Sequence, residues 1–201
     1  YSLKAIDENN IFKQPTKKVS ILSITRLEER KGIIPVLKSL GYLHKEKLIK
    51  PFIWKICGEG DQENEIKNYI DNLGLSKHVR LLGRVSNETK NQLLKKADLF
   101  VMPSYKVRNS IEGFGISYIE AASYGVPSIA GVEGGIRDAV FDMKTGWCVD
   151  PLNSNLLLDT IKEAINNKDR REKFGLEAKK QFSKKFLGEK VFRKFMNTIN
   201  S

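Results

Sequence analysis

The segment that decides the fold is EGFGISYIEAASYGVP, residues 112–127. Its two glutamates, Glu112 and Glu120, lie eight positions apart, and a glycine stands on each side of Phe114. Glycine lets the backbone turn tightly or approach a ligand closely, and small and apolar residues follow Gly115 without a helix breaker. We therefore expect a loop with Glu112 that turns into a helix with Glu120. The free N–H groups of such a helix start form an anion site, although an ordinary helix start with solvated glutamates is the alternative.

On both sides of this segment, short apolar runs rich in β-branched residues alternate with amphipathic runs. We expect strands at 19–25, 51–57, 79–82, 98–102, 127–130 and 146–149. We expect helices at 33–48, 62–73, 86–96, 153–166, 169–182 and 187–199. Regular alternation of strands and helices is typical of parallel βαβ units. The sequence therefore predicts an α/β fold, a Rossmann-like doubly wound parallel sheet of about six strands.

The candidate binding residues lie in loops that follow strands. In a doubly wound sheet, ligands bind beyond the carboxyl ends of the strands, so these loops should line one edge. The loops cover residues 26–31, 58–61, 83–85, 104–115 and 131–135. Arg26 and Lys31 flank the first loop, and two cations suit a diphosphate because each charge-assisted hydrogen bond contributes roughly 1.5–3 kcal/mol. A solvated surface loop is an equally weighted alternative, because the residues between them are also charged.

Several chemistries are disfavoured by what the sequence lacks. It has no Walker A motif, and the GxG at 58–60, after an expected strand, is not completed to the dinucleotide-binding pattern. The absence of Asp-x-Asp weakens a divalent-metal clamp, and two cysteines and two histidines far apart make no zinc site. We expect Cys57 and Cys148 to be unpaired core thiols. His44 and His78 show no partner pattern in the sequence, and we expect both to be structural or solvated.

The chain carries a formal net charge of +11, mostly from lysine. A solvated lysine-rich surface is the favoured explanation, and attraction to an anionic membrane surface comes second. Nucleic acid is not expected as a partner, because basic and aromatic residues are not interleaved. No apolar run approaches the ~20 residues that span a bilayer, and the polar start does not suggest a signal peptide.

Motifs in a fixed order carry a resemblance to a known family. They are SITRLEERKG (23–32), CGEG (57–60), VRLLG (79–83), ADLFVMPS (97–104), the segment 112–127, GG (134–135) and TGW (145–147). Together they resemble the signature of family 4 glycosyltransferases with the GT-B fold, in which two Rossmann-like domains face a cleft. Within that pattern, Thr25 replaces the usual glycine before Arg26 and adds a side chain beside the diphosphate. Asp138 stands where a glutamate often follows the glycine pair.

The resemblance implies a domain organisation. Residues 1–18 would be an inter-domain linker, and residues 19–182 would be the C-terminal, nucleotide-sugar-binding half of the GT-B fold. Residues 183–201 would carry a helix that returns toward an N-terminal domain absent from this chain. On this basis we expect the isolated domain to be inactive in sugar transfer.

The same resemblance implies roles for individual residues. Arg26 and Lys31 would hold the donor diphosphate and stabilise it as it leaves, and Glu112 would lie near the transferred sugar. Glu120 would accept hydrogen bonds from the ribose. The implied donor-binding positions are Gly58, Arg84, Val85, Phe114, Gly115, Ile116 and Glu120, with the backbone near Arg84 and Val85 at the base. No metal ligand and no separate cofactor are implied.

The implied function is a retaining, metal-independent hexosyltransferase. Its donor would be a nucleotide diphosphate sugar, with a UDP-sugar favoured, and its acceptor a saccharide or a lipid-linked molecule in polysaccharide or glycolipid assembly. The implied location is the cytoplasm, including the inner face of the plasma membrane. Two alternatives stay open: a nucleotide-sugar epimerase of the GT-B fold, and a non-enzymatic basic module that binds membranes or nucleic acid.

Overall fold

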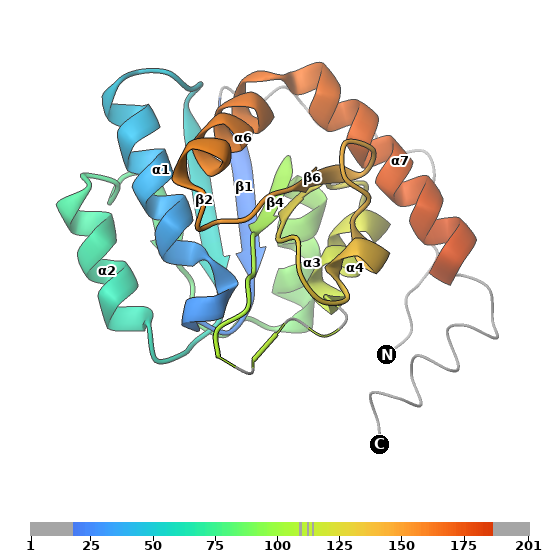
Figure 1. The fold of residues 1–201 in the computed structure, drawn as a ribbon, viewed down its shortest axis with the longest axis horizontal. Helices are drawn as coiled ribbons and strands as arrows, with labels where there is room; N and C mark the ends of the chain where they lie inside the picture. Colours follow the sequence, from blue (N-terminus) through green and yellow to red (C-terminus); the bar gives the residue numbers. More distant parts are fainter. Residues whose placement is uncertain (1–17, 109, 112, 114, 187–201) are drawn as a thin grey trace.

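The computed structural model describes residues 18–186, except residues 109, 112 and 114. At its centre is a six-stranded parallel sheet in the order β3-β2-β1-β4-β5-β6 (Figure 1). The strands are β1 (Val19–Ile24), β2 (Phe52–Cys57), β3 (Val79–Leu81), β4 (Leu99–Met102), β5 (Ser128–Ala130) and β6 (Gly146–Cys148). This order is that of a Rossmann-like sheet, so the predicted fold class is confirmed.

Helices cover both faces of the sheet. They are α1 (Ile33–Lys45), α2 (Glu63–Asn72), α3 (Asn87–Lys96), α4 (Ile116–Ser123), α5 (Ile136–Ala139), α6 (Ser154–Asn166) and α7 (Lys168–Phe186), with a 3-10 helix η1 (Glu29–Lys31). One apolar cluster joins α1, α2 and α6 to one face, and a second joins α3, α4 and α5 to the other. Adjacent residues of β1 divide between them, because Ile21 belongs to the first cluster and Leu22 to the second. Because successive side chains of a strand point to opposite faces of the sheet, β1 contributes to both cores.

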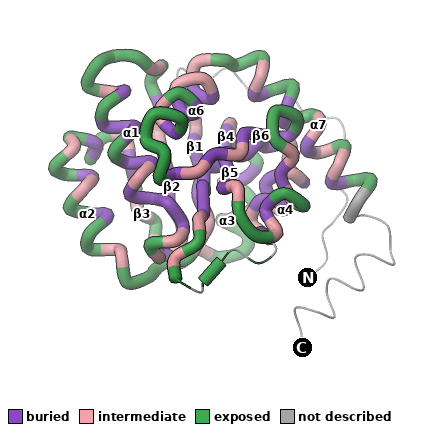
Figure 2. Tube along the Cα trace, in the orientation of Figure 1, coloured by how far each residue is buried: buried purple, intermediate pink, exposed green. Residues whose placement is uncertain are grey.

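The sheet itself is the most buried part of the chain, as Figure 2 shows in purple. Trp54 on β2 is fully buried, and its indole N–H donates to Ser23 Oγ on β1 at 2.9 Å. Ser23 Oγ in turn donates to the carbonyl oxygen of Val101 on β4. This chain satisfies the polar atoms that three neighbouring strands bury. Trp54 and Met102 both belong to the buried core.

Two helix ends differ from the predictions. The helix predicted over 33–48 ends at Lys45, because Lys47 adopts a left-handed conformation with φ 55°. The helix predicted over 169–182 runs from Lys168 to Phe186, because no breaker follows residue 182. Gly175 inside it does not interrupt it, and a Cβ there would lie 2.2 Å from the carbonyl oxygen of Gly125. This glycine allows α7 to approach the end of α4 closely.

The short elements η1 and α5 were not predicted, because four residues or fewer show no helical periodicity. The predicted linker lies almost entirely outside the described residues, and so does the helix predicted over 187–199. Residue 18 is a bend directly before β1.

The two histidines, which were expected to be structural or solvated, lie close to one another. The rings of His44, near the end of α1, and His78, just before β3, have centroids 4.2 Å apart. Phe52 lies 5.2 Å from the ring of His78. These residues lie at the start of β2 and β3, opposite the edge where the strand-end loops meet. Both Cys57 and Cys148 are free thiols, as expected.

Candidate functional site at the carboxyl edge of the sheet

The loops that follow the strands meet at one edge, as the sequence predicted. Backbone hydrogen bonds connect them directly, because parallel strands deliver their carboxyl ends to the same side. The loop after β1 is bonded to the loops after β2 and β4, and the loop after β2 to that after β3. These bonds are Leu27 N to Glu59 O at 2.9 Å, Tyr105 N to Arg30 O at 2.9 Å and Gly58 N to Gly83 O at 2.8 Å.

At Gly58 the backbone of the loop after β2 lies directly against the loop after β1. Gly58 adopts φ +131°, a conformation that residues with a Cβ rarely take. A Cβ at this position would lie 1.7 Å from the carbonyl oxygen of Thr25. Only glycine fits at position 58, which is the first glycine of the GxG at 58–60.

Thr25 fits the loop although glycine was the residue expected from the resemblance. Its N–H donates to the carbonyl oxygen of Cys57 at 2.9 Å, which continues the pairing of β1 with β2. Its φ is not positive, so the backbone does not need glycine. Its hydroxyl oxygen is buried without a hydrogen-bond partner among the described residues. Thr25 therefore places an unused polar group beside Gly58.

The two candidate cations of the first loop have different environments. The Arg26 side chain is 79% exposed, and its Nε lies 2.9 Å from Oε1 of Glu28. Lys31 is only 7% exposed and ends η1. Gly32 follows it with φ 71°, and a Cβ there would lie 2.3 Å from the carbonyl oxygen of Pro103 after β4. The loop therefore packs against the end of β4 directly after the buried Lys31, while the Arg26 side chain is exposed to solvent.

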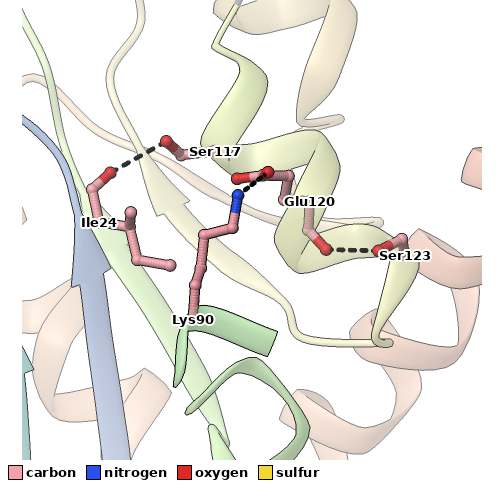
Figure 3. A network of polar contacts seen from close by, with 5 residues as sticks. All are labelled: Ile24, Lys90, Ser117, Glu120 and Ser123. Atoms are coloured by element: carbon pink, nitrogen blue, oxygen red, sulfur yellow. Dashed lines mark hydrogen bonds and ion pairs between the residues drawn. The ribbon is translucent and has the colours of Figure 1, made fainter. Parts of the chain in front are cut away.

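Helix α4 brings Glu120 to the same edge. Gly115 caps its N-terminus in the left-handed conformation with φ 66°. In the first turn of the helix, Ser117 Oγ donates to the carbonyl oxygen of Ile24 at the end of β1, at 2.9 Å (Figure 3). Glu120 follows on the same side of the helix and forms an ion pair through Oε1 with Nζ of Lys90 on α3 (Figure 3). The predicted placement of Glu120 on the helix is confirmed.

The remaining predicted positions that the structure describes lie on the loop after β3 and in the first turn of α4. Arg84 is exposed and Val85 half-buried on the loop between β3 and α3, and Ile116 is exposed at the first turn of α4. Ser86 caps α3, because its Oγ accepts from the N–H of Thr89 at 3.1 Å. Glu112 and Phe114 lie outside the described residues.

Two residues of this region were missed by the sequence reasoning. Lys90 follows the spacing of the buried face of α3, which holds Leu94 at i+4. A lysine on an apolar stripe was the available signal. Tyr118, fully buried, donates its hydroxyl to the carbonyl oxygen of Met102 at the end of β4. No sequence pattern indicated that this tyrosine ties α4 to β4.

Within the ranges that the structure describes, no cluster of three or more His, Cys, Asp or Glu side chains could hold a metal ion. In that same part of the chain, no helix combines the length and the apolar character that crossing a bilayer requires.

A six-stranded parallel sheet in this order, with its strand-end loops gathered at one edge, defines a Rossmann-like α/β domain. The sequence model of the family described as glycosyl transferases group 1 matches residues 6–181. The chain belongs to this family, and the resemblance found in its motifs is confirmed.

Relatives of known sequence are glycosyltransferases. An uncharacterized glycosyltransferase of Methanocaldococcus jannaschii is 36% identical over 139 residues, which cover 69% of this chain and 38% of that protein. A GDP-mannose-dependent phosphatidylinositol monomannoside mannosyltransferase of Mycobacterium tuberculosis is 28% identical over 159 residues, covering 78% of this chain and 40% of that protein. The chain therefore spans less than half of the length of these relatives.

Solved structures share the fold. A variant of S. aureus TarM in complex with fondaparinux, alpha-GlcNAc-glycerol and UDP has a TM-score of 0.78 and 26% identity, covering 98% of this chain and 38% of that one. Anabaena HepE in complex with UDP-glucose has a TM-score of 0.74 and 23% identity, covering 91% and 49%. At the identity of HepE the likeness concerns the fold alone.

Proposed function

We propose that this chain is the donor-binding domain of a retaining glycosyltransferase that takes its sugar from a nucleotide diphosphate sugar. The observation that supports this best is the meeting of two cations and a carboxylate at one sheet edge in a member of this family. Arg26 and Lys31 come from the loop after β1, and Glu120 comes from α4, which Ser117 ties to the end of β1. These are the groups that a diphosphate and a ribose require.

Each group has a role that follows from its chemistry. The loop of Arg26 and Lys31 would bind the diphosphate and stabilise the negative charge that develops as it leaves, which is electrostatic catalysis. Arg26 would exchange its contact with Glu28 for the phosphate, and its exposure makes that exchange inexpensive because a surface ion pair contributes little. Glu120 would accept hydrogen bonds from the two ribose hydroxyls, since a carboxylate has two acceptor oxygens.

The remaining proposed positions complete the donor site. Backbone near Arg84 and Val85 would meet the base, and Gly58 keeps the first two loops in contact. Backbone N–H groups of Phe114, Gly115 and Ile116 at the start of α4 would face the diphosphate or sugar, as a helix N-terminus favours anions. Glu112 would lie near the transferred sugar. We expect a UDP-sugar as donor, which the UDP bound in the TarM structure supports.

The proposed reaction needs no metal ion. The bond between the anomeric carbon and the diphosphate oxygen breaks, and a bond to the acceptor oxygen forms on the same face of the sugar. The proton of the acceptor hydroxyl passes to an oxygen of the departing phosphate. The leaving charge is then stabilised by the two cations of the loop after β1 rather than by a divalent ion.

The acceptor site would belong to a second domain. The chain spans 38% and 40% of the two relatives described above, which supports a partner domain on the N-terminal side, with residues 1–18 as the linker and residues 183–201 returning toward it. The acceptor would be a saccharide or a lipid-linked molecule. The basic surface would favour an anionic membrane surface as a location.

Isothermal calorimetry of the 201-residue chain with UDP, GDP and ADP tests the donor site. We expect one nucleotide to bind, and binding to be lost in the double variant Arg26→Ala with Glu120→Ala. The control removes one cation and one carboxylate from the surface of α7, Lys168→Ala with Glu172→Ala, which form an exposed pair at 3.4 Å. Binding of no nucleotide, or equal binding by both double variants, would refute the assignment.

A second experiment tests the chemistry in the full-length protein. Product analysis with and without a saccharide acceptor separates transfer from epimerisation, because an epimerase changes the nucleotide sugar without an acceptor. Transfer with retained anomeric configuration in the presence of a chelator is the expected outcome. A free epimerised nucleotide sugar as the main product would contradict the proposal.

A further inference from the structure

Lys90 occupies a position on α3 where an apolar residue would be expected. It shares the inward face of the helix with Leu94, which is fully buried. Its own side chain is 21% exposed, although lysine is seldom buried without a partner. A lysine ammonium held on an apolar face requires a compensating charge nearby. The compensating charge is Glu120, and this choice of partner connects α3 to the donor site.

The geometry around Glu120 is defined from three sides. Lys90 Nζ contacts Oε1 of Glu120, whose side chain is 25% exposed. Ser117 anchors the preceding turn of α4 to β1, and Ser123 Oγ donates to the carbonyl oxygen of Glu120 at 2.7 Å. Burial, and after it the charge of Glu120, raise the pKa of the Tyr124 phenol. The carboxylate is therefore held in a partly desolvated position, in which its rotamer depends on Lys90.

We propose that Lys90 is a positioning residue that holds the Glu120 carboxylate oriented for the ribose of the donor. This inference rests on the proposed function and deepens it. The ion pair leaves acceptor sites of the carboxylate available for the ribose hydroxyls, because its two oxygens offer about four such sites and the ammonium occupies one of them. Lys90 acts through Glu120, so its effect should depend on the ribose hydroxyls and on nothing else in the nucleotide.

This dependence gives a specific test by calorimetry with the 201-residue chain. The probes are UDP, GDP and ADP, and the counterpart of the best binder that lacks both ribose hydroxyls, a dideoxynucleoside diphosphate. Lys90→Met removes the charge and keeps most of the side-chain volume, and Lys90→Arg restores the charge. Lys95→Met is the matched control, since Lys95 is exposed on the same helix. Lys90→Gln replaces Lys90→Met if the latter does not melt cooperatively.

We expect Lys90→Met to weaken binding of the ribonucleotide roughly three- to tenfold, a range typical of two residues in direct contact. Binding of the dideoxy counterpart should change less than about twofold, and Lys90→Arg and Lys95→Met should bind like the unmodified chain. In a Glu120→Gln background, Lys90→Met should add no further loss, because the partner is already gone.

Three outcomes would overturn the inference. Equal weakening for the ribonucleotide and its dideoxy counterpart would mean that Lys90 acts on the phosphates or on the fold. Tighter binding by Lys90→Met would mean that Lys90 competes with the ribose for Glu120. Absence of binding by the unmodified chain to all three ribonucleotides would overturn this inference together with the proposed function, whereas the first two outcomes leave the proposed function intact.

Discussion

Replacing Gly58 by alanine would place a methyl group inside the contact between the loops after β1 and β2. The new Cβ would lie 1.7 Å from the carbonyl oxygen of Thr25, and the residue would have to keep φ +131°. Gly74 offers a matched control, because it also has a positive φ, +67°, but an added Cβ would meet no atom within 4 Å. Both substitutions add one methyl group at a glycine with positive φ, but only the methyl group at position 58 would overlap another atom.

The magnitudes follow from these two geometries. At Gly74 only the left-handed conformation of alanine costs free energy, about 1–2 kcal/mol. At Gly58 a backbone strain of about 1–3 kcal/mol adds to an overpacking cost of about 1–3 kcal/mol, because the obstructing atom is backbone and yields only if a loop moves. We therefore expect Gly58→Ala to lower the free energy of unfolding by about 2–6 kcal/mol, more than Gly74→Ala.

Differential scanning calorimetry measures the difference. For a chain of this size each kcal/mol lowers the melting temperature by about 2–4 °C, so Gly74→Ala should melt about 2–8 °C lower and Gly58→Ala clearly lower again. If Gly58→Ala folds by displacing the loop, nucleotide affinity should also fall, while Gly74→Ala should leave it unchanged. A melting temperature of Gly58→Ala equal to or above that of Gly74→Ala would refute the reasoning.

Three further predictions concern side chains to which the proposed function gives no role. Burial and the neighbouring His78 lower the pKa of His44 below 6.5. The unfolded chain therefore binds this proton more tightly than the folded chain does, so the free energy of unfolding should decrease as the pH falls below 6.5. Urea midpoints at neutral and mildly acidic pH check this, and His44→Gln should flatten the dependence. Arg171, 8% exposed, donates to two carbonyls at the end of α6, and Arg171→Met should lower the free energy of unfolding by about 1–3 kcal/mol in urea titrations. Burial raises the pKa of Cys57 to about 11 and, with a nearby carboxylate, that of Cys148 to about 12, so both thiols should react with iodoacetamide at pH 8 only after addition of denaturant, because the thiolate is the reactive form. Rapid alkylation of the folded chain would contradict this assignment.

Much of the fold could be predicted because its signals are local. Apolar β-branched runs separated by amphipathic runs indicated parallel βαβ units, and every predicted strand within the described residues was found within one or two residues. The prediction errors concern helix ends and very short helices, for which apolar periodicity gives no signal. The end of α1 depends on the left-handed Lys47, and η1 and α5 are too short to have a period. Helix α7 tolerates Gly175 because that residue packs against Gly125 in another segment.

The candidate site was predicted in part for the same reason. Arg26, Lys31 and Glu120 belong to short motifs whose spacing can be read along the chain, and parallel topology carries strand-end loops to one edge. Their different environments could not be read. Lys31 is buried and Arg26 is exposed although both lie in one charged loop, because only Lys31 is adjacent to the glycine that packs against the end of β4. Glu112 lies outside the described residues, and its role stays a prediction.

By itself, the sequence determined the alternation of strands and helices, the family and the side of the sheet on which its motifs lie, since each depends on neighbours along the chain. Only the tertiary structure decided that Lys90 pairs with Glu120 and that Gly58 must be glycine. Lys90 and Glu120 are 30 positions apart, and the Gly58 contact joins two different strands. Such contacts depend on how the sheet brings separate segments together, which no local pattern encodes.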